Sequence, residues 1–152
     1  MEKVFENFVI SVLKLYRLVQ RIKNYEMKEF GLKSIHVMCI YYLNESRDGL
    51  TSGELMRLTF EDKAAISRAV GQLCEKKYVT YDAGKYNSHV RLTHDGKVLA
   101  KTILEKSDRA VNAGRAEMTE EERQLFYKSL GEIAENLKNY YGNLIKGDGD
   151  AE

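Results

Sequence analysis

Near residue 78 the hydrophobic residues of this chain change their spacing from that of a helix to that of a strand. The segment FEDKAAISRAVGQLCEKKYV (60–79) has apolar residues three or four positions apart, at Ile66, Val70, Leu73 and Cys74. In the next segment, apolar and polar residues alternate on both sides of the turn-like run DAGKYNS, with the apolar positions at Val79, Tyr81, Val90 and Leu92. Alternation on both sides of a turn is typical of a β-hairpin. The sequence therefore predicts a helix followed directly by a hairpin.

The two halves of this helix differ in chemistry. Its C-terminal half has the spacing of a buried face, whereas its N-terminal half, DKAAISR (62–68), is small, polar and cationic. Small side chains let a helix backbone come close to another molecule, and polar ones reach base edges and phosphates. The N-terminal half is therefore predicted to bind and the C-terminal half to seat the helix on its own domain.

A short helix is predicted just before it. Thr51 and Glu54 have the spacing of a capping box, and Leu55, Leu58 and Phe60 are expected to pack inward. Two short helices joined by a tight turn and followed by a hairpin make a winged helix-turn-helix, whose second helix enters the DNA major groove.

Long helices are predicted on both sides of this region, and the chain contains no proline that would interrupt them. One runs over about 2–29 and ends at Gly31, and the next covers 33–45. The inward residues of the second are expected to be Ile35, Met38, Cys39 and Tyr42. A further helix is expected over 95–116. The last helix is expected to begin at a capping box of Thr119 and Glu122 and to run to about 146.

The first and last helices carry apolar stripes that one subunit cannot cover. These stripes predict a homodimer, with the dimerisation residues Phe5, Phe8, Val12, Leu130, Ile133, Leu137, Tyr140 and Leu144.

Composition limits the class of protein. The net charge is +1, and 43% hydrophobic with 31% charged residues is typical of a soluble globular protein. The N-terminal segment lacks the long uncharged run of a signal peptide or membrane span, so no membrane association is expected. Cys39 and Cys74 lie in apolar runs without a framework spacing, which predicts buried thiols in a cytoplasmic protein.

The segments LTSGELMRLTFEDKAAISRAVGQLCEKKYV (50–79), the hairpin and LTHDGKVL (92–99) together resemble the MarR family of bacterial transcriptional regulators. The resemblance implies a mainly α fold with a small β-hairpin wing, in which a winged helix-turn-helix is flanked by long dimerisation helices. It divides the chain into dimerisation helices (1–30 and 119–146), a DNA-binding region (33–94), a linking helix (95–117) and a disordered tail (147–152). The function it implies is a dimeric double-stranded-DNA-binding regulator, a repressor, on a pseudo-palindromic operator, with DNA affinity modulated by a small-molecule effector.

The resemblance also implies which residues face DNA. They are Thr51, Ser52, Asp62, Lys63, Ala64, Ala65, Ser67, Arg68, Gln72, Lys85 and Arg91. Arg68 is the best single candidate for a DNA contact, either with a phosphate or with the edge of a guanine. The alternative is that Arg68 forms a surface ion pair with Glu61 or Asp62. For Thr51, simple helix capping is the alternative.

Two features depart from the family pattern. The wing segment DAGKYNSHVR is short and has Lys85 in place of an arginine at its tip, which makes minor-groove reading doubtful. Lys77 stands where the family usually has glycine after the recognition helix, so a left-handed conformation there would cost about 1 kcal/mol. The alternative is that the helix ends in a different way.

Other readings of the sequence are weaker. His36, His89 and His94 lack metal-ligand spacing, and neither a catalytic motif nor a cofactor motif is present, so no metal, cofactor or enzyme activity is predicted. A ligand crevice lined by Tyr16, His36, Met38 and Tyr42 is weighed against ordinary core packing. The near-zero charge and arginine-poor wing leave one alternative function, a protein- or ligand-binding adaptor that has lost DNA binding.

Overall fold

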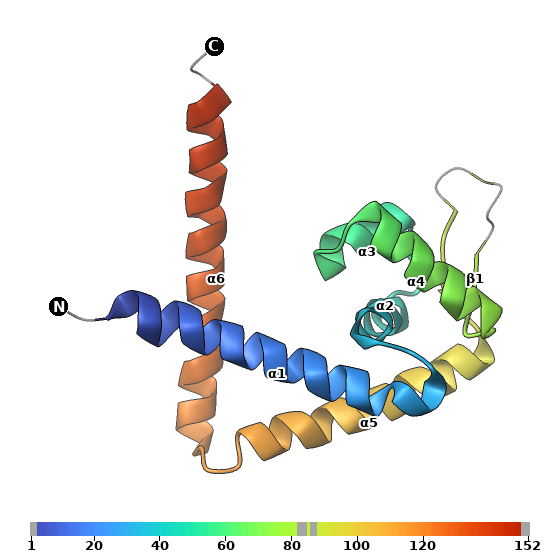
Figure 1. The fold of residues 1–152 in the computed structure, drawn as a ribbon, viewed down its shortest axis with the longest axis horizontal. Coiled ribbons are helices and arrows are strands. Elements are labelled where there is room, and N and C mark those ends of the chain that lie inside the picture. Colours follow the sequence, from blue (N-terminus) through green and yellow to red (C-terminus); the bar gives the residue numbers. More distant parts are fainter. Residues whose placement is uncertain (1–2, 82–84, 86–87, 150–152) are drawn as a thin grey trace. The chain divides into compact units, whose positions relative to one another are not determined.

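The computed structural model describes residues 3–81, 85 and 88–149 (Figure 1). It divides into two units, 1–110 and 111–152, and each unit is described by itself. The chain is mostly helical with one small antiparallel hairpin, which confirms the predicted fold class. None of the described helices is both long and apolar enough to span a bilayer.

The N-terminal helix begins as a π-helical stretch, η1 (Phe5–Ile10), and continues as α1 (Ser11–Glu26) and the short 3₁₀ helix η2 (Lys28–Phe30). Gly31 ends it in the left-handed region with φ 63°, as its position in the sequence predicts. No residue of α1 is buried within this structure. The apolar side chains of α1 are all exposed, although the helix contacts α2.

Helix α2 (Ser34–Glu45) is the centre of the first unit, in contact with α1, α3, α4 and β2 (Figure 1). Of the residues expected to face inward, Cys39 is buried, and Ile35 and Tyr42 are half-buried and pack against the core. Met38 is half-buried and lines a cleft instead. The helix is enclosed from several sides, so its buried residues do not form a single stripe. They are His36, Val37, Cys39, Ile40 and Leu43.

Helix α3 (Ser52–Thr59) begins at the predicted capping box. The Glu54 N–H donates to Thr51 Oγ1 over 3.2 Å, and the Thr51 N–H donates to Glu54 Oε2 over 2.8 Å. Leu55 is buried as predicted, but the predictions for Leu58 and Phe60 are wrong: they are 38% and 95% exposed. The helix ends before Phe60, whose φ of 58° makes the tight turn and takes its side chain out of the helical period.

Helix α4 (Lys63–Glu75) ends in a Schellman motif. The Lys77 N–H donates to Cys74 O and the Tyr78 N–H donates to Leu73 O, both over 2.9 Å. Lys77 has φ 63°, so this lysine adopts the left-handed conformation, which is unfavourable for a residue that carries a Cβ.

The wing consists of β1 (Val79–Thr80) and β2 (Arg91–Leu92), paired antiparallel with Val79 opposite Leu92. A further bridge joins Val90 to Leu50, which precedes α3. Val79 and Val90 are buried as the alternation predicts, but Tyr81 lies beyond β1 and is exposed. Of the predicted turn DAGKYNS, residues 82–84 and 86–87 lie outside the described residues.

Helix α5 (His94–Gly114) starts against the end of α4. The Thr93 N–H donates to Tyr78 O over 3.0 Å, and Thr93 Oγ1 accepts from the Gly96 N–H over 3.0 Å. Gly96 is buried, and a Cβ at this position would lie 2.0 Å from Tyr78 O. The close contact between α5 and the end of α4 therefore requires glycine at 96.

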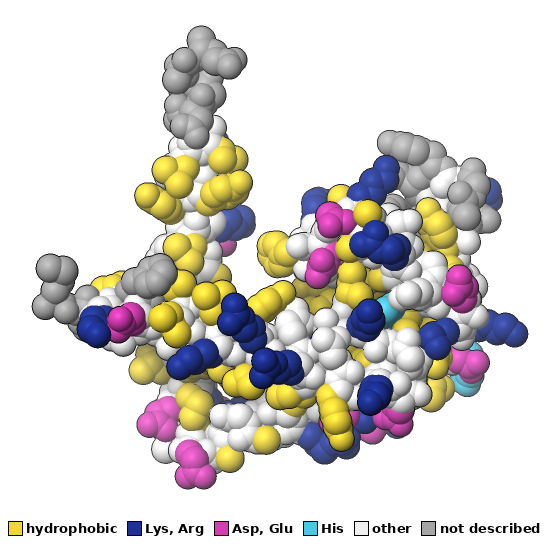
Figure 2. All heavy atoms as spheres, viewed as in Figure 1, with side chains coloured by type: hydrophobic (Ala, Val, Ile, Leu, Met, Phe, Trp, Pro, Cys, Tyr) yellow, Lys and Arg dark blue, Asp and Glu magenta, His cyan; other side chains and the backbone are white. Residues whose placement is uncertain are grey.

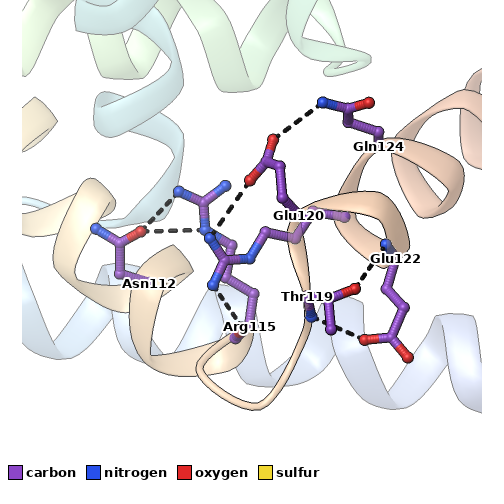
Figure 3. A network of polar contacts seen from close by, with 7 residues as sticks. Asn112, Arg115, Thr119, Glu120, Glu122 and Gln124 are labelled. Atoms are coloured by element: carbon purple, nitrogen blue, oxygen red, sulfur yellow. Dashed lines mark hydrogen bonds and ion pairs between the residues drawn. The ribbon is translucent and has the colours of Figure 1, made fainter.

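The second unit contains α6 (Glu120–Gly149), which begins at the predicted capping box of Thr119 and Glu122 (Figure 3). Before it, Asn112 Oδ1 accepts from Arg115 Nε and Nη2, so the connection between α5 and α6 is held by local side-chain contacts. The helix runs to Gly149, beyond the end expected near 146, and residues 150–152 lie outside the described residues. Figure 2 shows hydrophobic side chains along much of α6, and no α6 side chain that the structure describes is buried.

Candidate nucleic-acid interface

Helix α4 has one buried and one exposed face. Ile66, Ala69, Val70 and Leu73 are buried. The positions i, i+3, i+4 and i+7 on the outer side are exposed, and they are Ala64, Ser67, Arg68 and Gly71. A Cβ added at Gly71 would meet nothing within 4 Å. This outer face is therefore shallow and open, and the long Arg68 side chain extends from its middle.

Arg68 has no ion pair or hydrogen bond with any residue in the described part of the chain, and the alternative of a surface bridge to Glu61 or Asp62 is not seen. Asp62 is instead the N-cap of α4, since its Oδ1 accepts from the Ala65 N–H over 2.7 Å. The guanidinium is thus available to an external acceptor, while the neighbouring carboxylate is engaged with the helix start.

Ser52 and Ser67 come together although they are distant in sequence. They line a hollow of about 310 Å³ with Val70, Gly71, Cys74 and Tyr81. The hollow lies between the start of α3, the outer side of α4 and the residue after β1. Two predicted DNA contacts therefore share one concave surface at the base of the wing.

The other predicted DNA contacts differ in their surroundings. The Thr51 hydroxyl accepts from the Glu54 N–H and donates to Glu54 Oε2, so this side chain acts as a cap. Ala65 is half-buried, whereas Lys63, Lys85 and Arg91 are exposed. Arg91 lies on β2 opposite Thr80.

His36 and Gln72 form a contact that sequence analysis missed. His36 is only 2% exposed, and its Nε2 lies 2.7 Å from Gln72 Oε1, which links α2 to α4. The other ring nitrogen, Nδ1, accepts from the Lys33 N–H over 2.9 Å at the start of α2. His36 is thus placed behind α4 and does not line the crevice predicted for it. No pattern joins two residues 36 positions apart, so the sequence carried no sign of this pair.

Burial lowers the pKa of His36 below its ordinary value of 6.5. The hydrogen bond to Gln72 raises this pKa but offsets only part of the effect of burial. The unfolded chain therefore binds more protons than the folded chain just below pH 6.5, and stability is lost as the pH falls through this range. We expect urea unfolding at pH 7.5 and 5.5 to show this loss, and His36→Gln to reduce it. His89→Gln, at an exposed position, is the control, and an equal reduction in both variants would contradict the assignment.

A cleft of about 250 Å³ lies between α1, α2 and the turn after α3. It contains three of the four predicted ligand residues, Tyr16, Met38 and Tyr42. The other lining residues were not predicted from the sequence, and they are Gln20, Lys23, Ser34, Ile35, Leu58, Thr59, Phe60 and Glu61. Burial lowers the pKa of Lys23, and the charge of Glu61 offsets part of this effect. Gln20 Oε1 is buried and has no hydrogen-bond partner among the residues that the structure describes. The cleft thus combines aromatic walls with the Lys23 cation, the Glu61 carboxylate and the Gln20 acceptor.

The cysteines have the character of structural thiols. Burial, helped by Glu61, raises the pKa of Cys39 to about 12, and burial also raises the pKa of Cys74. Cys39 is buried as predicted, but Cys74 is only half-buried because it borders the hollow beside Ser67. Among residues 3–81, 85 and 88–149, no three His, Cys, Asp or Glu side chains are grouped as metal ligands.

Comparison with known proteins gives a consistent result. Residues 30–84 match the MarR family model, and no curated protein sequence matches the chain. A MarR protein from Peptoclostridium difficile superposes with a TM-score of 0.82 at 22% identity, covering 95% of both chains. A MarR-family regulator from Listeria monocytogenes complexed with a 26mer DNA gives 0.80 at 20% identity, covering 92% of this chain and 95% of that one. The S. aureus MepR–DNA complex gives 0.74 at 16% identity, covering 85% and 97%.

Proposed function

We propose that this chain, which matches the MarR family over residues 30–84 and shares the fold of MarR-family regulators, is a sequence-specific DNA-binding transcriptional regulator, a repressor. The observation that carries the proposal is the outer face of α4. Its small residues would let the helix enter the major groove, and Arg68 is unpaired within the described residues and extends from the middle of that face.

The glycine at 71 supports this assignment. Glycine inside a helix costs about 0.5–1 kcal/mol relative to alanine, and no packing constraint within the described residues requires it here, since a Cβ would meet open space. A close approach of another molecule to the α4 backbone gives a reason for this costly residue. The wing base and the Ser52–Ser67 hollow lie beside the same face and would receive the flanking phosphates.

Selection from a pool of random duplexes tests the proposal. A homodimer with one α4 in each of two successive major grooves should enrich a pseudo-palindrome with half-sites about 10 bp apart. Failure to enrich any sequence at low salt would favour the adaptor alternative, in which the winged helix binds no DNA.

We expect dimerisation through α1 and α6. Both helices expose apolar side chains along their length, including Val12, Leu130 and Leu137, more than a soluble monomer leaves uncovered. Leu137→Asp is expected to produce a monomer by sedimentation and to weaken operator binding at least tenfold, because both half-sites must be held together. Asn139→Asp adds the same charge on the exposed surface of α6 and should stay dimeric; a dimeric Leu137→Asp would contradict the assignment.

We also propose that a small amphipathic anion binds in the cleft of Tyr16, Met38 and Tyr42 and lowers DNA affinity. The aromatic walls suit an apolar ring, and Lys23 suits an anionic group. The cleft touches the turn between α3 and α4, so its occupant could shift the recognition helix. We expect aromatic carboxylates to raise the melting temperature of wild type but not of Lys23→Met. Equal shifts in both proteins would place binding elsewhere.

A further inference from the structure

We propose that His36 fixes the Gln72 side chain of α4 as a hydrogen-bond donor toward DNA, so that Gln72 contacts an acceptor on the duplex. The acceptor is a phosphate oxygen or an acceptor atom of a base edge. The proposal rests on the proposed DNA-binding function. It specifies that, in one contact of that interface, Gln72 donates the hydrogen bond and the duplex accepts it.

The first step is the state of the His36 ring. His36 Nδ1 lies 2.9 Å from the Lys33 backbone N–H and 3.3 Å from the Lys33 carbonyl oxygen. The N–H contact is the shorter of the two and an N–H can only donate, so we assign Nδ1 as the unprotonated nitrogen. Burial and the nearby charges of Lys33 and Lys76 all lower the pKa of His36, which keeps the ring neutral at pH 7. A neutral ring with an unprotonated Nδ1 carries its proton on Nε2.

The second step is the orientation of Gln72. The Nε2–H of His36 donates over 2.7 Å, so the atom of Gln72 that faces it must be the amide oxygen. Oxygen and nitrogen of an amide point in different directions, so the Gln72 nitrogen is turned away from the buried ring. Gln72 is exposed, and no described residue accepts a hydrogen bond from this nitrogen.

The third step is the position of Gln72 on the helix. It lies one turn after Arg68 at i+4, and therefore on the same side of α4. A free glutamine reads adenine by donating to N7 and accepting from N6. Because Oε1 is held toward His36, Gln72 is left to donate, which favours guanine N7 or O6, thymine O4 or a phosphate oxygen over the adenine pair.

The test compares two replacements of Gln72 on the selected duplex. Gln72→Met removes the donor, and about tenfold weaker binding is expected. Gln72→Glu keeps the acceptor for His36 but places a second acceptor outward, so it should bind more weakly than Gln72→Met. Binding by Gln72→Glu at the wild-type level would overturn the proposal. A loss in Gln72→Met that is equal on all single-base variants of the duplex identifies a phosphate, and a loss confined to one base pair identifies a base edge.

The role of His36 is tested by a double-mutant cycle. His36→Leu should lose about as much affinity as Gln72→Met, and the double variant should lose no more than either single variant. Asn24→Ala is the matched control, because Asn24 Oδ1 accepts from the Ser34 N–H at the same helix start without touching Gln72. It should lower the melting temperature while keeping DNA affinity. Additive losses in the cycle would overturn the positioning role.

The outcomes separate this proposal from the proposed function. If Arg68→Ala loses affinity and Gln72→Met does not, the function stands and this proposal fails. If wild type binds no duplex, both fail. A ¹⁵N NMR spectrum of the His36 ring gives an independent answer: protonated Nε2 is expected, and protonated Nδ1 would overturn the proposal.

Discussion

Arg68→Ala is expected to weaken binding to the selected operator by about 30-fold or more. A bidentate arginine–guanine contact contributes about 1–3 kcal/mol, and a dimer would lose it in both half-sites. The fold should be unaffected, because Arg68 is exposed and has no partner in the described part of the chain. Fluorescence anisotropy with labelled operator measures the affinity, and a denaturant melt checks the stability.

Arg109→Ala provides the matched control. Arg109 is exposed on α5, so the variant removes the same charge from the same unit without altering α4. Its operator affinity should stay within about twofold of wild type, because only a general charge effect remains. Equal losses in the two variants would mean that net charge, and no specific contact of Arg68, drives binding.

Gly96→Ala should lower the free energy of unfolding by about 3 kcal/mol. The added Cβ would stand 2.0 Å from Tyr78 O and 3.2 Å from Leu92 Cδ2. The first contact is with backbone, which cannot rotate away, so α5 must move off the end of α4 and the base of the wing. Urea unfolding followed by circular dichroism measures the loss.

Gly71→Ala tests the same substitution where there is room. It should raise the free energy of unfolding by about 0.5–1 kcal/mol, because alanine favours the helix and meets open space. The same variant should bind the operator more weakly, since its methyl group would stand on the outer face of α4. A stability loss at Gly71 similar to that at Gly96 would show that the crowding at Gly96 is not the cause.

The elements that strong local patterns determine could be predicted from the sequence. The capping boxes at Thr51 and Thr119 start α3 and α6, and the apolar spacing of Ile66, Val70 and Leu73 gives the buried face of α4. Gly31 ends the first helix, and the change of period near residue 78 gives the wing. Each depends on neighbours within a few residues in the chain.

The features that were missed depend on a local turn at Phe60 and, in the other cases, on contacts between distant segments. Phe60 follows the apolar spacing of α3, but its left-handed turn conformation takes it out to solvent. His36 looked like a crevice residue, yet the packing of α2 against α4 brings it to Gln72. Gly96 carries no local sign of the Tyr78 carbonyl that makes it necessary. The cleft was predicted only in part, because residues from α1, α2 and the turn after α3 meet there.

The most direct test of DNA binding is the affinity of the wild-type chain for its selected duplex over a range of salt concentrations. Phosphate contacts release counterions, so the logarithm of the association constant should fall linearly and steeply with the logarithm of salt concentration. A duplex of unrelated sequence should bind about 10³-fold more weakly at physiological salt. Affinity that is flat with salt, or equal for the two duplexes, would contradict a sequence-specific DNA-binding regulator and favour the adaptor.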